Sequence, residues 1–279
     1  MPSRISPPLR RAQLGETLRE LRAASGLKLD EVAQKLRCSR GKVSNVENGN
    51  SLVTPGYVRD ALALYGADEP TQRRCIQLIM DARTEPWWKP YGKVLGDYVI
   101  YETEARVIRY WQAQVVPGLL QTLDYARAVI AADRPWEEHD LVRLRARARI
   151  ARQTLLSADD PLAVEAIIGE QALRQPIGGP TVMADQLGRL LEEAGRSTTS
   201  IRVLAGAAVM SSFVLYAMPD MPPVLYREGV DEIVDHGGVP EFELRFEHLA
   251  AAALTRGESA GLIRSIREEF LQLVDRGVA

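Results

Sequence analysis

The stretch CSRGKVSNVENGN, Cys38 to Asn50, gathers side chains that donate and accept hydrogen bonds, with only one acidic residue among them. Arg40 and Lys42 carry positive charge, whereas Ser44 and Asn45 offer neutral hydrogen-bonding groups. An arginine presents a planar fork of N–H donors, and an asparagine presents donors and an acceptor side by side. This combination favours recognition of a polar, anionic partner.

A second pattern, GESAG at residues 257–261, matches the G-x-S-x-G sequence around a hydrolase nucleophile. That chemistry needs a strand before the serine, a helix after it and a histidine later in the chain. Here the preceding stretch AAALTR is typical of a helix, and the last histidine, His248, comes before Ser259. We therefore expect Ser259 in the first turn of a terminal helix, and we predict that the protein is not an enzyme.

Metal and cofactor chemistry has little support in the sequence. His139, His236 and His248 have no partner at metal-ligand spacing, and neither have Cys38 and Cys75. The glycine-rich patterns of dinucleotide-binding and P-loop proteins are absent from the sequence. We expect no metal and no cofactor.

A run of arginines stands in VRLRARARIARQ, residues 142–153. An apolar stripe at helical spacing is formed by Leu141, Leu144, Ala148, Ala151 and Leu155, which leaves the other faces to Arg143, Arg145, Arg147, Arg149 and Arg152. This pattern predicts a solvated face that pairs with acidic residues of the same domain. Binding of phosphate or another anionic ligand is the alternative.

Net charge differs between two parts of the 279-residue chain, which indicates different partners for them. Residues 1–84 hold 14 Lys+Arg and 9 Asp+Glu, a net charge of +5, whereas 85–279 hold 21 and 28, a net of −7. The 46% hydrophobic content is enough for a sizeable core, and no apolar run is long enough for a membrane span or a signal peptide. We expect a cytoplasmic protein with no membrane contact.

Residues 1–84 read as a domain of five short helices. Apolar spacing, caps and glycine stops predict them at Leu9–Ala24, Asp30–Leu36, just after Ser39, Pro55–Tyr65 and Glu69–Arg83. Ser39 and Thr54 are good N-caps, because a hydroxyl can accept an unpaired backbone N–H. Gly49 is a good C-terminal stop.

The second and third of these helices are separated only by Arg37–Ser39, so they must cross steeply. Val43 and Val46 then face inward against the second helix, which leaves Arg40, Ser44 and Asn45 on the outer surface of the third. A narrow, positive, polar helix face of this kind suits the major groove of DNA. A solvated helical hairpin is the alternative.

The segment Gly26–Gly49 resembles the lambda-repressor-like (Xre) helix-turn-helix family in Val32-Ala33, Ser39, Val43, Val46 and the closing Glu47-Asn48-Gly49. The resemblance implies that the third helix reads DNA. It assigns the DNA-binding residues Lys28, Ser39, Arg40, Gly41, Lys42, Ser44, Asn45, Asn48, Asn50 and Ser51. Lys28 and Leu29 replace the usual cap and phosphate contact of the second helix, and Gly41 has no side chain to read with.

The rest of the chain reads as a linker, 85–98, and an α+β domain, 99–279, with a small, mostly antiparallel sheet. Helices are expected at 101–114, 122–132, 137–156, 180–194, 240–254 and 258–274. Strands are expected at 162–169, 200–204, 212–218 and 223–229. Trp87 and Trp88 are too apolar for a free linker and are expected to pack against one domain.

Several phrases of the second domain, among them VPGLLQTLDYARAVI at 116–130, resemble actinobacterial regulators that join an Xre-type domain to a C-terminal domain. These regulators resemble antitoxins and are often paired with a small acidic protein. The resemblance implies a DNA-binding transcriptional regulator with a C-terminal domain for dimerisation and partner binding. A small-molecule sensor is the main alternative. Double-stranded DNA and a second copy of the chain are the expected partners, because one helix-turn-helix reads only a few base pairs.

Overall fold

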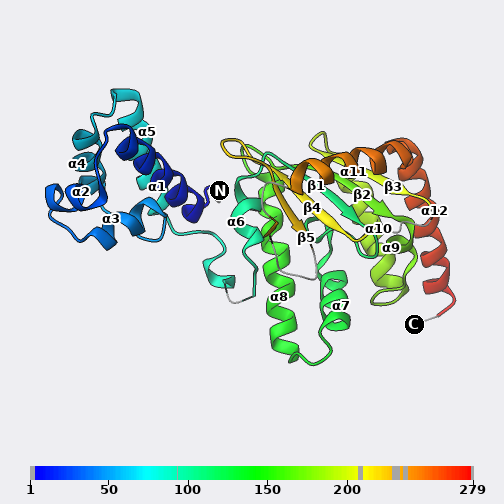
Figure 1. Cartoon of the computed structure of the whole chain (residues 1–279). Helices are drawn as coiled ribbons and strands as arrows, with labels where there is room; N and C mark the ends of the chain where they lie inside the picture. The colour runs from blue at the N-terminus through cyan, green and yellow to red at the C-terminus, as the bar shows by residue number, and fades with distance from the viewer. Residues whose placement is uncertain (1–3, 93, 207–209, 228–232, 235–237, 278–279) are drawn as a thin grey trace. The chain divides into compact units, whose positions relative to one another are not determined.

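The computed structural model describes residues 4–92, 94–206, 210–227, 233–234 and 238–277. The chain divides into two compact units, Arg4–Lys89 and Pro90–Ala279 (Figure 1). The paired tryptophans belong to the first unit: Trp88 is buried, and its ring meets that of Trp87 edge to face with centroids 5.7 Å apart.

The first unit contains all five predicted helices. They are α1 (Pro7–Ala24), α2 (Leu29–Lys35), α3 (Arg40–Glu47), α4 (Pro55–Tyr65) and α5 (Glu69–Ala82). Ser39 and Thr54 are confirmed as N-caps, since their hydroxyls accept the backbone N–H groups of Lys42 and Tyr57. One core joins the five helices, and it includes Leu14, Leu18, Val32, Val43, Val46, Val58, Leu62, Cys75 and Ile79.

The second unit is built on one mixed sheet in the order β3-β2-β1-β4-β5-β6. Its strands are β1 (Val107–Gln112), β2 (Ala163–Gly169), β3 (Thr199–Leu204), β4 (Phe213–Ala217), β5 (Val224–Arg227) and β6 (Ile233–Val234). The pairs β1–β2 and β2–β3 are parallel, whereas β1–β4, β4–β5 and β5–β6 are antiparallel. The predicted α+β class is confirmed, with a parallel half that the sequence prediction did not contain.

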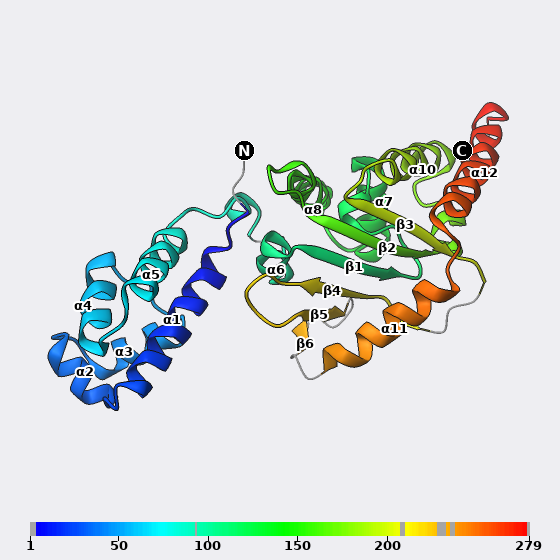
Figure 2. The ribbon, with the colours of Figure 1, turned by 90° about the horizontal axis from the view of Figure 1, so that it is seen from above.

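Helices cover both faces of this sheet. They are α6 (Tyr98–Glu104), α7 (Leu123–Asp133), α8 (His139–Ala151), α9 (Glu170–Arg174), α10 (Pro180–Ala194), α11 (Val239–Ala252) and α12 (Arg256–Asp275). Figure 2 shows α11 on one side of the sheet and α7, α8 and α10 on the other. On the α11 side, Trp111, Phe213 and Leu225 of the sheet pack with Phe246 and Leu249 of the helix. Parallel strands need crossover connections, and α7–α8 and α10 supply them.

The helix predicted at 101–114 is wrong. Its first part lies in α6, but the chain becomes extended at Ala105 and continues as β1. Val107, Ile108, Tyr110 and Trp111 are β-branched or aromatic, and both neighbouring strands pair with them. Packing in the centre of a sheet makes such a segment a strand, although its apolar residues also fit the spacing of a helix.

The loop with the sequence VPGLLQT, 116–122, is held by its own Gln121 and by side chains of α8 and α10. The Gln121 amide donates to Val116 O over 2.7 Å and accepts from Arg149 Nη1 over 2.9 Å. Gln186 of α10 accepts the Thr122 N–H over 2.7 Å and donates to Leu120 O over 2.8 Å. This part of the resemblance therefore marks a structural loop.

The arginine run is not one solvated face, because its last member is buried. Arg152 is 7% exposed as a side chain and donates from Nε to Glu102 Oε1, which is fully buried, over 2.6 Å. Burial alone lowers the pKa of Arg152, but the charge and hydrogen bonds of Glu102 hold it well above its ordinary value. Arg143 and Arg145 do pair with acidic residues, Asp140 and Glu137.

Ser259 lies in the first turn of α12, as predicted, and is buried. Its Oγ accepts the Val203 N–H over 2.9 Å, and Val203 O accepts from Leu254 N–H over 2.9 Å. Arg256 donates to Thr199 O over 3.0 Å. The serine and its neighbours thus cover the outer edge of β3.

Candidate nucleic-acid interface

The turn between α2 and α3 is fixed by backbone hydrogen bonds. Arg37 N–H donates to Gln34 O, and Cys38 N–H donates to Ala33 O, the paired bonds of a Schellman motif. This motif requires a left-handed residue, and Arg37 takes that role with φ at 50°. Ser39 then caps α3 directly, so only residues 36–39 connect α2 to α3.

The exposed surface of α3 is as predicted. Val43 and Val46 are buried in the helical core, whereas Arg40, Gly41, Lys42 and Asn45 are exposed and Ser44 is half-buried. Of the other candidate residues, Lys28, Ser39, Asn48 and Asn50 are exposed and Ser51 is half-buried. The helix-turn-helix therefore gathers all ten predicted residues on α2, α3 and the loops that flank them.

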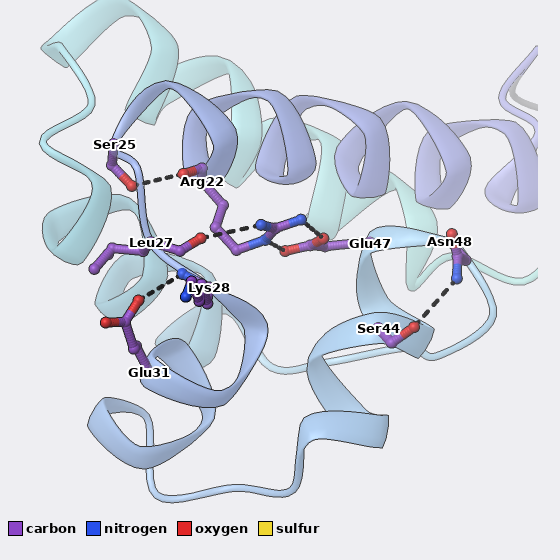
Figure 3. Close-up of polar contacts among 8 residues, drawn as sticks. All are labelled: Arg22, Ser25, Leu27, Lys28, Glu31, Ser44, Glu47 and Asn48. Atoms are coloured by element: carbon purple, nitrogen blue, oxygen red, sulfur yellow. Dashed lines mark hydrogen bonds and ion pairs between the residues drawn. The ribbon is translucent and has the colours of Figure 1, made fainter.

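Half-buried Arg22 and buried Glu47 link α1 to the end of α3 (Figure 3). Arg22 donates from Nε and Nη2 to the two carboxylate oxygens of Glu47 over 2.7 and 2.9 Å, and from Nη1 to Leu27 O over 3.1 Å. The hydrogen bonds to Glu47 raise the pKa of Arg22. One guanidinium thus ties together α1, the start of the α2 segment and the exposed helix.

A close approach of backbones fixes α3 from the other side. A Cβ on Gly15 of α1 would lie 2.5 Å from Val46 O and 2.8 Å from Glu47 O. Gly49 ends α3 with φ at 69°, and a Cβ there would lie 2.9 Å from the Cα of Ala12. Arg11 donates to Gly49 O over 2.6 Å. Glycines at these two points let α1 lie directly against the end of α3.

The start of α2 lacks a side-chain N-cap, as the departure at Lys28 predicts. The carboxylate of Glu31 accepts the Lys28 N–H over 2.7 Å instead (Figure 3). This leaves the ammonium group of Lys28 exposed at the helix start.

Polar side chains along α3 have local partners that leave them exposed. Asn48 Nδ2 donates to Ser44 Oγ over 3.4 Å (Figure 3). The Lys42 ammonium lies 5.2 Å from the centre of the Tyr57 ring. Arg40 Nε lies 3.7 Å from Asp30 Oδ1, with both side chains mostly exposed.

The charges at the start of α3 oppose the stability of the helix. The N-terminal end of a helix carries partial positive charge, which favours acidic residues there. The first turns of α2, α5 and α12 contain Asp30, Glu69 and Glu258, whereas those of α1, α3 and α4 contain no acidic residue. The first turn of α3 also carries Arg40 and Lys42, so this end of α3 is suited to an anionic partner.

Other candidate chemistry is not assembled in the described residues. Within them, no three His, Cys, Asp or Glu residues lie close enough to hold a metal ion, and no helix is long and apolar enough to cross a membrane. His139 and His248 are exposed, and His236 lies outside the described residues.

Comparison with known families agrees with this geometry. Residues 13–74 match a helix-turn-helix domain. Its fold and its exposed α3 define a helix-turn-helix DNA-binding regulator. Residues 95–265, more than half of the chain, match a domain of unknown function (DUF5753). The chain belongs to that family. No curated protein and no solved structure matches it significantly.

Arg22 and Gly15 are the parts of the interface that sequence reasoning missed. Each contacts or approaches α3 from α1, which lies earlier in the chain. Gly15 has no side chain, so the sequence offers no functional group from which its role could be predicted. Glu47 was identified by the Glu47-Asn48-Gly49 resemblance, but the residue that it binds was not.

Proposed function

We propose that the protein is a sequence-specific transcriptional regulator of the Xre type that places α3 in the major groove of DNA. The observation that carries the proposal is the pair of cations, Arg40 and Lys42, in the acid-free first turn of an exposed helix. The two cations disfavour the helix dipole at this end, and a bound anion would offset that effect.

Base recognition is assigned to the middle of the exposed surface. Arg40 is proposed to bind guanine through two parallel hydrogen bonds, and Asn45 to bind adenine in the same manner. Ser44 lies between them, and Gly41 allows a close approach of the backbone. Ser39 holds the helix start through its cap to Lys42.

Backbone contacts are assigned to the residues at the rim of this surface. Lys28, Lys42, Asn48, Asn50 and Ser51 are proposed to meet phosphates on the two sides of the groove. Such contacts set affinity and register and carry no sequence information. A single unit covers one half-site, so we propose a homodimer on a two-fold operator.

For the second unit we propose a role in dimerisation and in binding a small, antitoxin-like partner protein. Large apolar side chains are exposed on it: Trp136 after α7 is 76% exposed, and Leu244 on α11 is 73% exposed. Exposed aromatic and aliphatic side chains of this size are typical of protein interfaces. Residues 85–98 are proposed to act as the linker.

A small-molecule sensor, the alternative function, would need polar side chains that have no hydrogen-bond partner within the free protein and can bind a ligand. Part of the buried polar cluster of the second unit is paired internally, because Arg152 binds Glu102 and Arg149 binds Gln121. The buried amide of Gln112 at the end of β1, however, has no hydrogen-bond partner among the described residues, so the sensor stays the alternative.

The test is DNA binding by substituted proteins on a site selected from random DNA by the wild-type chain. Arg40→Ala and Asn45→Ala should each weaken binding to that site by roughly 1–3 kcal/mol. Arg74→Ala, on the exposed surface of α5, is the matched control and should bind as the wild type does. Unchanged footprints for the Arg40→Ala/Asn45→Ala double variant would refute the assignment.

A further inference from the structure

The two acidic residues in the first turn of α2 have different partners. Glu31 reaches back to the Lys28 N–H over 2.7 Å and so completes the helix start. Asp30 instead faces α3, where its Oδ1 lies 3.7 Å from Arg40 Nε. Glu31 therefore serves the helix, and Asp30 lies beside the foremost cation of the proposed DNA surface.

This ion pair does little for the stability of the free protein. The Arg40 and Asp30 side chains are 67% and 77% exposed, and pairs so exposed are weak in water. A negative charge also opposes the approach of DNA phosphates. An aspartate at this point therefore weakens general DNA affinity, and its presence calls for a role in recognition.

The geometry of the pair suggests what that contribution is. The ion pair of Asp30 with Arg40 is made at Nε and not at the two terminal nitrogens of the guanidinium. Those nitrogens are sufficient for a bidentate contact with guanine. When DNA excludes water, the attraction between the two charges strengthens. The carboxylate then restricts the rotation of the guanidinium and disfavours its escape to a phosphate.

We propose that Asp30 is a positioning residue that holds Arg40 for guanine and thereby sets base preference at one operator position. The proposal rests on the proposed function of α3 as the reading helix. It makes Asp30 a source of specificity at the expense of general affinity.

The test measures binding of the full chain to its selected operator and to variants of that operator in which each base pair is replaced in turn. The proteins are wild type, Asp30→Asn, Asp30→Glu, Arg40→Ala and the Asp30→Asn/Arg40→Ala double variant. Asp60→Asn is the matched control, since Asp60 is exposed on α4 and has no ion pair within the described residues. Thermal midpoints are measured for all variants, so that unfolding is recognised.

The proposal expects that Asp30→Asn reduces guanine preference about tenfold at a single position, part of the roughly 5- to 150-fold that one bidentate pair supplies. Arg40→Ala should remove preference at that same position, and Asp30→Asn should add nothing in its background. Asp30→Asn should bind non-specific DNA at least as tightly as the wild type. Asp30→Glu should retain part of the guanine preference.

An unchanged guanine preference in Asp30→Asn overturns the proposal while leaving the reading role of Arg40 intact. A loss of preference spread evenly over all positions, or one equally produced by Asp60→Asn, overturns it as well. If Arg40→Ala leaves every base preference unchanged, the proposed function of Arg40 fails first, and the role of Asp30 fails with it.

Discussion

Arg37 occupies the left-handed position that ends α2, with φ at 50°, where glycine is the usual residue. An L-residue pays roughly 1–2 kcal/mol for this conformation because its Cβ crowds the following carbonyl. The side chain is exposed, so packing does not explain the choice. Its charge lies in the turn that leads into α3.

Replacing Arg37 by glycine should therefore stabilise the first unit. Relief of the backbone strain exceeds the entropy that a glycine loses on folding, so we expect a gain of about 0.5–1 kcal/mol. Arg37→Ala keeps the strain and serves as the control. Thermal unfolding followed by circular dichroism measures both, and a lower midpoint for Arg37→Gly would contradict the explanation.

Single residues were predictable from the sequence where the reason is local. Ser39 and Thr54 were identified as caps because a cap acts only three residues ahead. The Arg22–Glu47 pair spans 25 residues, and no spacing rule connects its two members. Neither the partner of Glu47 nor the burial of Arg152 is visible until the fold brings distant helices together.

At the scale of elements, the position of α3 depends on how closely α1 approaches it. Gly15 lies where a side chain would meet two backbone carbonyls, those of Val46 and Glu47. A carbonyl held in a helix cannot move as a flexible side chain does. The proposed DNA-binding surface is thus positioned by a glycine on a helix that carries none of its ten candidate residues.

Gly15→Ala should force α1 and α3 apart, although alanine is the better helix former. We expect a loss of about 1–3 kcal/mol in unfolding free energy, as for other overpacked sites. Gly41→Ala is the matched control, because a Cβ there meets only the Ser39 hydroxyl at 4.0 Å. That change should stabilise α3 by about 0.5–1 kcal/mol. Chemical denaturation compares the two, and equal effects would count against the close approach.

Elements were predicted well where their periodicity and their packing agree. The five helices of the first unit and α10 follow from apolar spacing, caps and glycine stops. The segment 101–114 has apolar residues that fit a helix as well as a strand. Its pairing with β2, more than 50 residues later, decides the matter, and that information is absent from the local sequence.

At the scale of the whole molecule, the two units have separate cores and separate buried ion pairs. Arg22–Glu47 supports the first unit, and Glu102–Arg152 supports the second. The latter is the more deeply buried, so removal of one partner leaves a charge without a counterion in the interior. A substitution at this pair should therefore lower the stability of the second unit.

Glu102→Gln should lower the stability of the second unit by about 3–5 kcal/mol. Calorimetry of the full chain should show the corresponding transition at lower temperature, while the transition of the helical unit stays in place. Glu165→Gln is the control, since its pair with Arg109 is partly exposed and should contribute less than about 1 kcal/mol. Equal shifts in the two variants would argue against a structural role for the buried pair.

The class of each unit was predictable because composition and the succession of elements differ between them. The parallel half of the sheet was not, because β1 was taken for a helix and the crossover through α7 and α8 then had no first strand. The predicted DNA surface needed only the local order of α2 and α3. The supports behind that surface needed the complete fold.

The covering of β3 by Ser259, Leu254 and Arg256 limits how other chains can associate with this protein. An open sheet edge is a template onto which a strand of another chain can be added, either by a specific binding partner or in aggregation. At β3 the backbone groups of Val203 are already engaged on that side. A partner that recognises this end of the sheet must therefore bind side chains on the surface of α12 instead of extending the sheet, and the same device protects the protein from edge-to-edge polymerisation there.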